Sequence, residues 1–382
     1  MTGQEDDTLE PTSLAFRENS RRALGDPLLQ EALSGLVNWQ AARAAAAAAL
    51  PEFEQLRDLG RDIKNHTLAH LDLYLERFTA AAEAAGAKVH WARDAAEARA
   101  HVLAICREAK ARTVTKSKSM IAEEIGLNPY LEANGIQPIE TDLGEYIIQL
   151  AGERPSHLIG PAIHKTKGEV ADLFQRHHGG PKLEEPGEMV AEARRMLRRR
   201  YLEADVGVTG ANFLIAETGS IVTVTNEGNA ELTQGLPRIH VCVASIEKLV
   251  PTVEDAFTLL RLLPRSATGQ EFAGYTTVIT GPRRPGDLDG PEQFHIVLVD
   301  NGRSKMVGTV YQDMLRCIRC GACMNYRLAT RLAGGVLGLA GRRRGRFRRL
   351  PLASGWTGTR DLPAPEGGTF MAQWASRPRS RP

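Results

Sequence analysis

Cysteine is scarce in this sequence, and it is absent from the last part of the chain. Five cysteines occur among 382 residues, and none follows Cys323. An odd number of cysteines, three of them within one short segment, excludes the disulfide framework of a small secreted protein. Reduced thiols are typical of the cytoplasm, so we expect a cytoplasmic protein.

Long apolar runs are also lacking. The alanine-rich run at 44–50 falls far short of the ~20 apolar residues that cross a bilayer, so we predict no integral membrane segment. The acidic first residues lack the basic and apolar regions of a signal peptide. With 42% hydrophobic and 25% charged residues, the composition is typical of a soluble globular protein of two or three domains.

Lysine is missing from residues 327–382, which carry 12 arginines and two acidic side chains, a net charge of +10. Removing these from the totals of 48 basic and 46 acidic residues leaves 36 and 44, so the body carries −8. The run Arg342–Arg349 suggests a nucleic-acid arm. The Arg/Gly/Ala/Pro composition instead favours a frameshift or truncation after Tyr326. We therefore expect a disordered or out-of-frame tail, with nucleic-acid binding as the alternative.

The segment Cys317-Ile-Arg-Cys320-Gly-Ala-Cys323 holds three of the five cysteines. Two Cys-x-x-Cys steps that share a middle residue match the first three positions of a bacterial ferredoxin-type site, so we predict a 4Fe–4S cluster. A zinc site or a chance run of surface thiols are the alternatives. The fourth cysteine and the proline of the ferredoxin pattern are replaced by Arg327 and Leu328.

Strand and helix patterns alternate through the body of the chain, and this alternation is typical of an α/β protein with a parallel sheet. Strands are predicted at 88–92, 113–116, 136–140, 157–163, 206–209, 213–216, 221–225, 239–243, 275–280 and 294–299. Helices are predicted at 61–85, 94–111, 120–134, 143–151, 167–177, 189–203, 251–263 and 308–316. Residues 1–60 are expected to form a helical arm.

Polar residues gather where predicted strands end, which is where open α/β sheets place their ligands. Lys116, Ser117 and Lys118 follow one strand and precede a helix, so they are candidates for holding an anion. The alternative is a solvated helix cap with surface lysines. The nearby Asp142 is predicted to be a helix cap, and Cys106 a core residue.

A second polar stretch surrounds the predicted strand 221–225. Glu217 and Glu227 are candidates for a nucleophile or a base, and Asn226 and Asn229 for ligand-binding residues. The alternative is a hairpin with polar turns. We expect structural roles for four histidines that lack metal-ligand spacing. These are His157, His164, His240 and His295.

Seven motifs in order make residues 15–323 resemble the lactate utilization protein B family, the iron–sulfur members of the LUD-domain group. The motifs are Lys116-Ser-Lys-Ser-Met, Glu140-Thr-Asp-Leu-Gly-Glu-Tyr-Ile, Pro161-Ala-Ile-His-Lys, Gly210-Ala-Asn-Phe-Leu-Ile-Ala-Glu-Thr-Gly-Ser, Thr225-Asn-Glu-Gly-Asn, Val299-Asp-Asn-Gly-Arg-Ser and Cys317-x-x-Cys-x-x-Cys.

The resemblance implies an α/β LUD domain, similar to the fold of glucosamine-6-phosphate isomerase, ribose-5-phosphate isomerase and CoA-transferases, at 61–303. It also implies a ferredoxin-like module, of which 304–326 is the start. Family members continue to a second cluster loop, which is missing here together with the remote fourth ligand of the first cluster. Cys106 and Cys242 are poor substitutes because both lie on apolar elements.

The resemblance implies an electron-transfer subunit in the oxidation of L-lactate to pyruvate, with Cys317, Cys320 and Cys323 as iron ligands. Other lactate-utilization subunits and electron donor and acceptor proteins are the expected partners, and they would bring the protein to the inner face of the membrane. Three cysteines suit a 3Fe–4S cluster or a 4Fe–4S cluster with an outside ligand. The alternative is an enzyme acting on a small carboxylate or CoA ester through Glu217 or Glu227.

Overall fold

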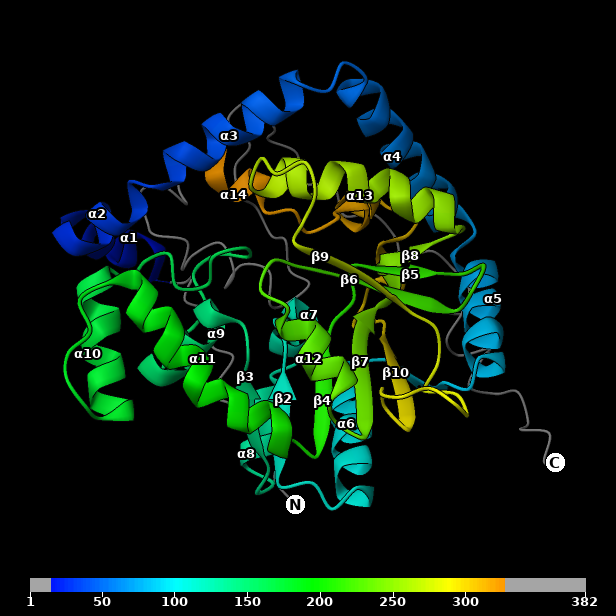
Figure 1. Ribbon diagram of the computed structural model, residues 1–382. Helices are drawn as coiled ribbons and strands as arrows, with labels where there is room; N and C mark the ends of the chain where they lie inside the picture. Colours follow the sequence, from blue (N-terminus) through cyan, green and yellow to red (C-terminus); the bar gives the residue numbers. More distant parts are fainter. Residues whose placement is uncertain (1–14, 327–382) are drawn as a thin grey trace.

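A parallel sheet forms the centre of the computed structural model, which describes residues 15–326 (Figure 1). Its strands are β1 (Lys88–Ala92), β2 (Thr113–Lys116), β3 (Gln137–Glu140), β4 (Val206–Thr209), β7 (Ile239–Ser245) and β10 (Gln293–Val299). They lie in the order β1-β10-β7-β4-β2-β3, and all five neighbouring pairs are parallel. The predicted α/β class and parallel sheet are confirmed.

A second, four-stranded sheet lies beside the carboxyl ends of β7 and β10 (Figure 1). It contains β5 (Phe213–Ile215), β6 (Ser220–Thr225), β8 (Leu249–Val250) and β9 (Tyr275–Ile279) in the order β8-β5-β6-β9. β5 and β6 form an antiparallel hairpin, and β9 continues it on the far side of β6. The hairpin that was the alternative for this stretch is therefore present.

Helices cover both faces of the parallel sheet, as parallel strands require. Around it lie α5 (Leu71–Ala84), α6 (Ala95–Glu108), α7 (Met120–Glu124), α8 (Leu127–Glu132), α9 (Leu143–Ala151), α10 (Lys167–His178), α11 (Pro186–Glu203) and α12 (Asn229–Gly235). One core joins α6, α7 and α8 to one face of the sheet, and a second joins α5 to its other face and to the second sheet. A third core joins α9, α10 and α11 beside β3.

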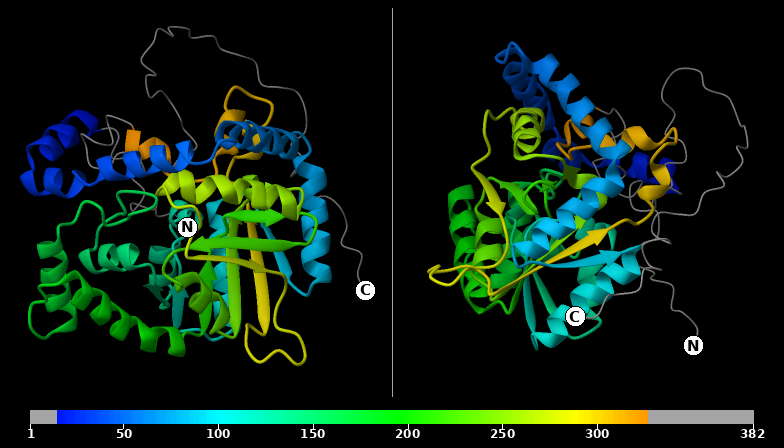
Figure 2. Two further views of the ribbon diagram at one scale, coloured as in Figure 1. Left: turned by 45° about the horizontal axis from the view of Figure 1, so that its top comes forward. Right: turned by 90° about the vertical axis from the view of Figure 1, so that its right-hand side faces the viewer.

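The N-terminal helices α1 (Phe16–Gly25), α2 (Pro27–Leu33), α3 (Leu36–Ala48) and α4 (Phe53–Ala69) form an arm over the domain. Both α3 and α4 lie along α13 (Val253–Ala267), as Figures 1 and 2 show. Phe53 and Leu56 of α4 are buried against Leu259 and Leu262 of α13. The arm is thus packed on the body. No helix of the described chain is long and apolar enough to cross a membrane.

Three predicted elements differ in the structure. Residues 157–163 form turns, not a strand, because Gly160 and Pro161 interrupt the run. The helix predicted at 120–134 breaks at Gly126, whose φ of 65° lies in the left-handed region that glycine tolerates. The segment 308–316 forms turns and a 3₁₀ helix at Gln312–Arg316.

One further helix prediction changes, and one helix was not predicted. The helix predicted at 61–85 is two helices, because His70 (φ −126°) belongs to neither. The short helix α12 begins directly after the turn Asn226–Gly228, where no helix was predicted. Elsewhere the caps are as predicted: Asp94 accepts from Glu97 N at 2.9 Å and Asp142 from Glu145 N at 3.1 Å.

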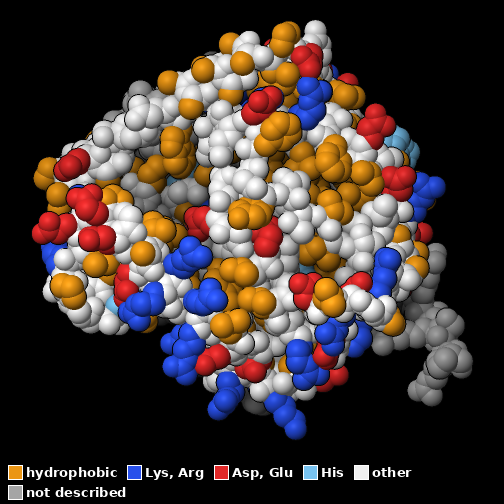
Figure 3. All heavy atoms as spheres, in the orientation of Figure 1, with side chains coloured by type: hydrophobic (Ala, Val, Ile, Leu, Met, Phe, Trp, Pro, Cys, Tyr) orange, Lys and Arg blue, Asp and Glu red, His pale blue; other side chains and the backbone are white. Residues whose placement is uncertain are grey.

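The face drawn in Figure 3 carries Lys and Arg side chains along its lower left, over α11. The sequence of α11 explains them, because it holds five arginines within Arg194–Arg200. Two of these arginines pair with glutamates of the same helix, Arg195 with Glu192 and Arg199 with Glu203. We interpret this stripe as a solvated helix face.

Candidate functional site

The cysteine segment packs on the body of the molecule. It follows the 3₁₀ helix at Gln312–Arg316 and leads into α14 (Ala322–Tyr326). Ile318 and Cys320 lie against the core shared by α4, α13 and the second sheet. Met324 is buried against Leu158 of the turn segment 157–163. The segment is therefore held at both ends by apolar contacts.

Two left-handed residues give the cysteine segment its shape. Arg319 has a φ of 63° and Gly321 a φ of 74°. A Cβ atom at position 321 would also lie 3.0 Å from Ile159 Cγ1, which is closer than side chains normally approach. Glycine between the last two cysteines is thus required by both backbone conformation and space.

The three thiols differ in exposure. Cys317 and Cys323 are exposed, and Cys320 is partly buried. Burial raises the pKa of Cys320, and the neighbouring Cys317 and Cys323 raise it further. Thiolates at this position face cations on the body: Cys317 interacts electrostatically with both Lys64 and Lys248.

The donor set suits part of an iron–sulfur site. Three thiols on one loop can supply three of the cysteine ligands of an iron–sulfur cluster, and nearby cations offset the negative charge of such a cluster. Within residues 15–326, however, no three His, Cys, Asp or Glu side chains converge closely enough to hold a metal ion. Cys106 and Cys242 are fully buried in apolar cores, and burial raises the pKa of each thiol to about 12. Neither is placed to act as a fourth ligand.

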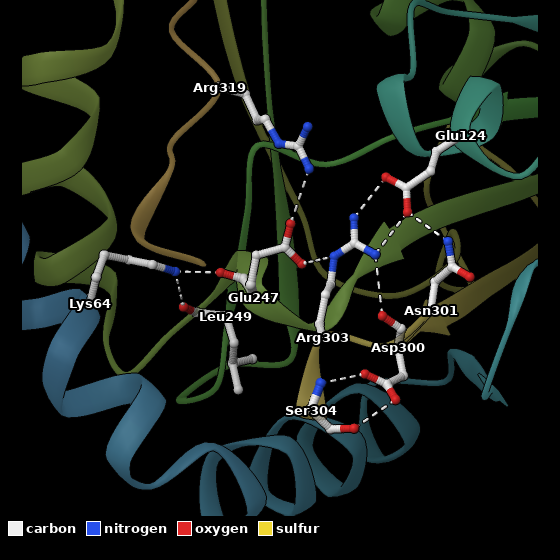
Figure 4. Close-up of polar contacts among 9 residues, drawn as sticks. All are labelled: Lys64, Glu124, Glu247, Leu249, Asp300, Asn301, Arg303, Ser304 and Arg319. Carbon is white, nitrogen blue, oxygen red and sulfur yellow. Dashed lines mark hydrogen bonds and ion pairs between the residues drawn. The ribbon is translucent and has the colours of Figure 1, made fainter. Parts of the chain in front are cut away.

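A buried ion network lies between the cysteine segment and the parallel sheet (Figure 4). Glu247, just after β7, is 2.7 Å from Arg303 Nε and 3.3 Å from an Arg319 terminal nitrogen. Arg303 also donates to both carboxylate oxygens of Glu124, at 2.9 and 2.8 Å. Burial alone would raise the pKa of Glu247, but Arg303 and Arg319 hold it at about 2. Glu247 is thus a carboxylate saturated with cations.

Lys64 of α4 completes this network from the other side. Its ammonium donates to the backbone oxygens of Glu247 and Leu249 (Figure 4). Burial lowers the pKa of Lys64 to about 8, against the opposing effects of Glu247 and Cys317. The N-terminal arm is therefore connected by a buried cation to the same segment that carries Glu247.

A cavity of about 240 Å³ lies at the carboxyl edge of the parallel sheet. Its wall includes several residues that the sequence marked as ligand candidates, and one residue of the cysteine segment, Arg319. The candidates that line it are Ser117, Lys118, Asn226, Glu227 and Asn229. The structure thus brings together two stretches that lie about 110 positions apart in the sequence.

Charged candidates on the cavity wall are partly neutralised. Lys118 donates to Asp142 at 2.8 Å and to the Ile159 carbonyl at 3.0 Å. Glu227 accepts from Leu143 N at 2.9 Å, at the start of α9. Desolvation and the nearby Asp142 raise the pKa of Glu227 above its ordinary value. Asn226 fastens the loop before β9, because its side-chain oxygen accepts from Gly274 N at 2.8 Å.

Two sequence candidates lie elsewhere. Lys116 is buried and pairs with Glu140 at 2.8 Å, outside the cavity wall. Glu217 is exposed, and its carboxylate accepts from Val253 N at 3.0 Å at the start of α13. We interpret Lys116 as part of a buried pair and Glu217 as a helix-terminal residue.

The histidines have the structural partners expected of them. His240 contacts Thr209 Oγ1 at 2.8 Å, His295 contacts His90 at 3.0 Å and His164 contacts Ser156 Oγ at 2.7 Å. His157 accepts from Ile159 N at 3.1 Å and so shapes the turn beside Gly321. Burial lowers the pKa of His240 to about 3 and that of His295 to about 4.

Sequence reasoning missed Lys248, Glu247 and Arg303. The sequence predicts Ser245-Ile-Glu-Lys-Leu-Val250 as a connection between the strand 239–243 and the helix 251–263, where charged residues are usually solvated. In the structure it holds the end of β7, a 3₁₀ helix at Ile246–Lys248 and β8. One signal was present: Glu247 and Lys248 come shortly after a mainly apolar strand, at the edge where open sheets bind ligands. Arg303 lies in the quoted motif Val299-Asp-Asn-Gly-Arg-Ser, but its role depends on a contact with Glu247 that no spacing reveals.

The comparison with protein families matches the LUD domain to residues 75–299. Lactate utilization protein B of Geobacillus kaustophilus is 46% identical over 322 residues, which are 84% of this chain and 68% of that protein. The protein of the same name from Geobacillus thermodenitrificans is 48% identical over 287 residues, 75% of this chain and 60% of that protein.

Bacillus licheniformis lactate utilization protein B is 42% identical, covering 84% of this chain and 68% of that protein. A crystal structure of a DUF162 family protein from Deinococcus radiodurans aligns with a TM-score of 0.32 at 16% identity, over 60% of this chain and 98% of that chain. The LUD-domain match and the sequence identity with these relatives indicate the same family. This chain belongs to the lactate utilization protein B family and contains its LUD domain.

Proposed function

We propose that this chain is an iron–sulfur electron-transfer subunit in the oxidation of L-lactate to pyruvate, with Cys317, Cys320 and Cys323 as iron ligands. The observation that carries the proposal is the position of the three-cysteine loop beside cations of the body. Lys64 and Lys248 both interact electrostatically with Cys317, and Arg319 lies within the loop itself. The names of the relatives, lactate utilization protein B, supply the metabolic role.

An iron–sulfur cluster bound at this loop would supply one-electron transfer. The chain's own residues would fix its position and charge. Gly321 allows the loop to turn, Ile318 packs on the core, and Glu247 holds Arg319. Cations around thiolates favour the anionic form of each ligand. The three cysteine ligands of the loop would suit a 3Fe–4S cluster or a 4Fe–4S cluster with an outside ligand.

We also propose the domain boundaries of the chain. The helical arm would span 1–60, of which 1–14 lie outside the described residues, the LUD domain 61–303 and the start of the cluster module 304–326. A likeness of the LUD domain to the glucosamine-6-phosphate isomerase, ribose-5-phosphate isomerase and CoA-transferase fold belongs to the same proposal. Partner subunits that deliver and accept electrons would complete the system, in the cytoplasm or at the inner face of the membrane. The tail predictions concern 327–382, which lie outside the described residues.

Anaerobic reconstitution of the full chain with iron and sulfide tests the electron-transfer proposal. Iron and sulfide analysis should give stoichiometric iron, and reduction should give an electron paramagnetic resonance signal. Cys320→Ser should lose most of the iron. Cys106→Ala is the control, because Cys106 is a buried core residue, and it should retain iron. Absence of iron from the reconstituted wild-type chain would contradict the proposal.

A second candidate function is an enzyme that uses Glu227 as a base on a small carboxylate. The observation that favours it is the position of Glu227 on the cavity wall with a raised pKa. Glu217, outside the cavity, is not supported in this role by its position. Turnover that survives Cys→Ser changes but is abolished by Glu227→Gln would select this function over electron transfer.

A further inference from the structure

Lys248 is a buried lysine without a polar partner in the described chain. Its residue is 8% exposed, and it lines the cavity at the carboxyl edge of the parallel sheet. Within residues 15–326 its side chain takes part in no hydrogen bond or ion pair. Glu247 and Cys317 act on Lys248 electrostatically, but neither accepts a hydrogen bond from it. A buried ammonium without an acceptor is costly, so an anion in the cavity would stabilise it.

The other buried cations of residues 15–326 show what Lys248 lacks. Each has an acceptor: Lys64 has two backbone oxygens, Lys116 has Glu140, Arg265 has Glu271, and Arg303 has Glu124 and Glu247. The carboxylate next to Lys248 in sequence is Glu247, and Arg303 and Arg319 already occupy it. Lys248 therefore directs a positive charge toward the cavity.

A second cation reaches the cavity from the cysteine segment. Arg319 lines it, and the contact with Glu247 at 3.3 Å uses one terminal nitrogen of the guanidinium (Figure 4). The third cation of the wall, Lys118, is already paired with Asp142. Arg319 therefore keeps guanidinium donors that Glu247 does not use, and Lys248 keeps all of its donors, on a wall that also carries the carboxyl groups of Asp142 and Glu227. A carboxylate can accept from both an ammonium and a guanidinium.

The rest of the wall favours an organic anion. Asn229 is 4% exposed, and within the described chain its side chain has no hydrogen-bond partner, so an amide faces the cavity with unused donors and acceptor. Apolar side chains complete the wall, including Ile121, Leu158 and Leu263. A volume of about 240 Å³ suits a molecule of a few carbon atoms. Mixed walls of this kind are typical of small-molecule sites.

We propose that this cavity binds a small 2-hydroxy or 2-oxo carboxylate, with its carboxylate between Lys248 and Arg319 and its second oxygen toward Asn229. The choice of this substrate class rests on the proposed function, whereas binding itself requires no iron in the cysteine segment. The site would place the bound carboxylate beside the cysteine loop, because Arg319 belongs to both.

Calorimetric titration of the full, iron-free chain at constant ionic strength tests this inference. The probes are L-lactate, pyruvate and inorganic phosphate. We expect the two carboxylates to bind and phosphate to bind at least tenfold more weakly. Lys248→Met should weaken carboxylate binding at least tenfold and raise the thermal midpoint, because a buried unpaired charge is replaced by an apolar side chain of similar length. Arg319→Gln should weaken binding several-fold.

Lys167→Met is the matched control, because Lys167 is an exposed lysine at the start of α10, outside the cavity. It should leave both affinity and thermal midpoint unchanged. Carboxylate binding that is unaffected by Lys248→Met and Arg319→Gln would overturn the inference, and so would binding of phosphate alone.

Iron content separates this inference from the proposed function. Iron in the reconstituted chain without carboxylate binding would contradict the carboxylate site alone. Carboxylate binding without iron after reconstitution would contradict the electron-transfer proposal alone.

Discussion

Lys116 and Lys248 are two buried lysines at the same edge of the parallel sheet, and their surroundings are opposite. Lys116 ends β2 beside Glu140, the last residue of the neighbouring β3, at 2.8 Å. Lys248 follows β7 by three residues and has no such partner in the described chain. Lys116 is 1% exposed and Lys248 8%. Burial is therefore similar, and pairing distinguishes the two.

The difference in pairing also shifts the pKa values of the two lysines in opposite directions. Burial alone would lower the pKa of Lys116, but Glu140, Glu123 and Glu145 raise it above its ordinary value. Burial and, after it, the neighbouring Arg319 lower the pKa of Lys248 to about 7, against the raising effects of Glu247 and Cys317. A lysine that the fold neutralises serves the fold, whereas one that it leaves unpaired beside a cavity is available to a ligand.

Replacing Lys116 should produce the largest effect on stability. In Lys116→Met the carboxylate of Glu140 loses its cation while it stays buried, which costs about 3 kcal/mol of unfolding free energy. Urea unfolding followed by circular dichroism measures this loss. The double variant Lys116→Met/Glu140→Gln should recover much of it, because no buried carboxylate remains. A single variant as stable as the wild type would remove the distinction between the two lysines.

His240 is a third buried basic side chain, and it is buried in its neutral form. Its pKa falls from 6.5 in the unfolded chain to about 3, because of burial. Below pH 6.5 the unfolded state binds a proton that the folded state rejects, so stability falls as pH decreases. This contribution amounts to about 2 kcal/mol between pH 7 and pH 5.

Comparison of urea unfolding at pH 7 and pH 5 in the wild type and His240→Gln measures this contribution. Gln can keep the contact with Thr209 and does not titrate. The variant should therefore lose about 2 kcal/mol less than the wild type over this range. Equal losses in the two proteins would show that His240 is not the group that titrates.

Lys248→Met should have the smallest effect on stability, and its sign should be opposite to that of Lys116→Met. Removing a buried unpaired cation should increase the unfolding free energy by about 1 kcal/mol at pH 7 without ligand. The same urea experiment measures it, with Lys167→Met as the neutral control. A decrease comparable to that of Lys116→Met would mean that Lys248 is a structural residue.

Much of the fold could be predicted from the sequence, because its strands are short apolar runs between clear helix signals. The six parallel strands and most helices follow from periodicity and from caps such as Asp94 and Asp142. The errors occur where tertiary contacts decide. In the segment 157–163, Leu158 is buried against Met324 of α14, next to the cysteine segment, and not by strand pairing.

The candidate site could be predicted only in part. Ser117, Lys118, Asn226, Glu227 and Asn229 stood out because polar residues after strands gather at one edge of a sheet. Lys116 belongs to the same motif but points to Glu140, since successive side chains of a strand alternate between its faces. Lys248 could not be predicted as a site residue, because its lack of a hydrogen-bond acceptor is a property of the folded chain.

Arg319 has a consequence for regulation, because it is shared by the cysteine segment and the cavity wall. Two ligands that contact one residue are thermodynamically linked, and the linkage is reciprocal. Any factor by which iron in the loop changes the affinity for a carboxylate must equal the factor by which the carboxylate changes the affinity for iron. A single guanidinium would then couple metal binding in the cysteine segment to occupancy of the cavity.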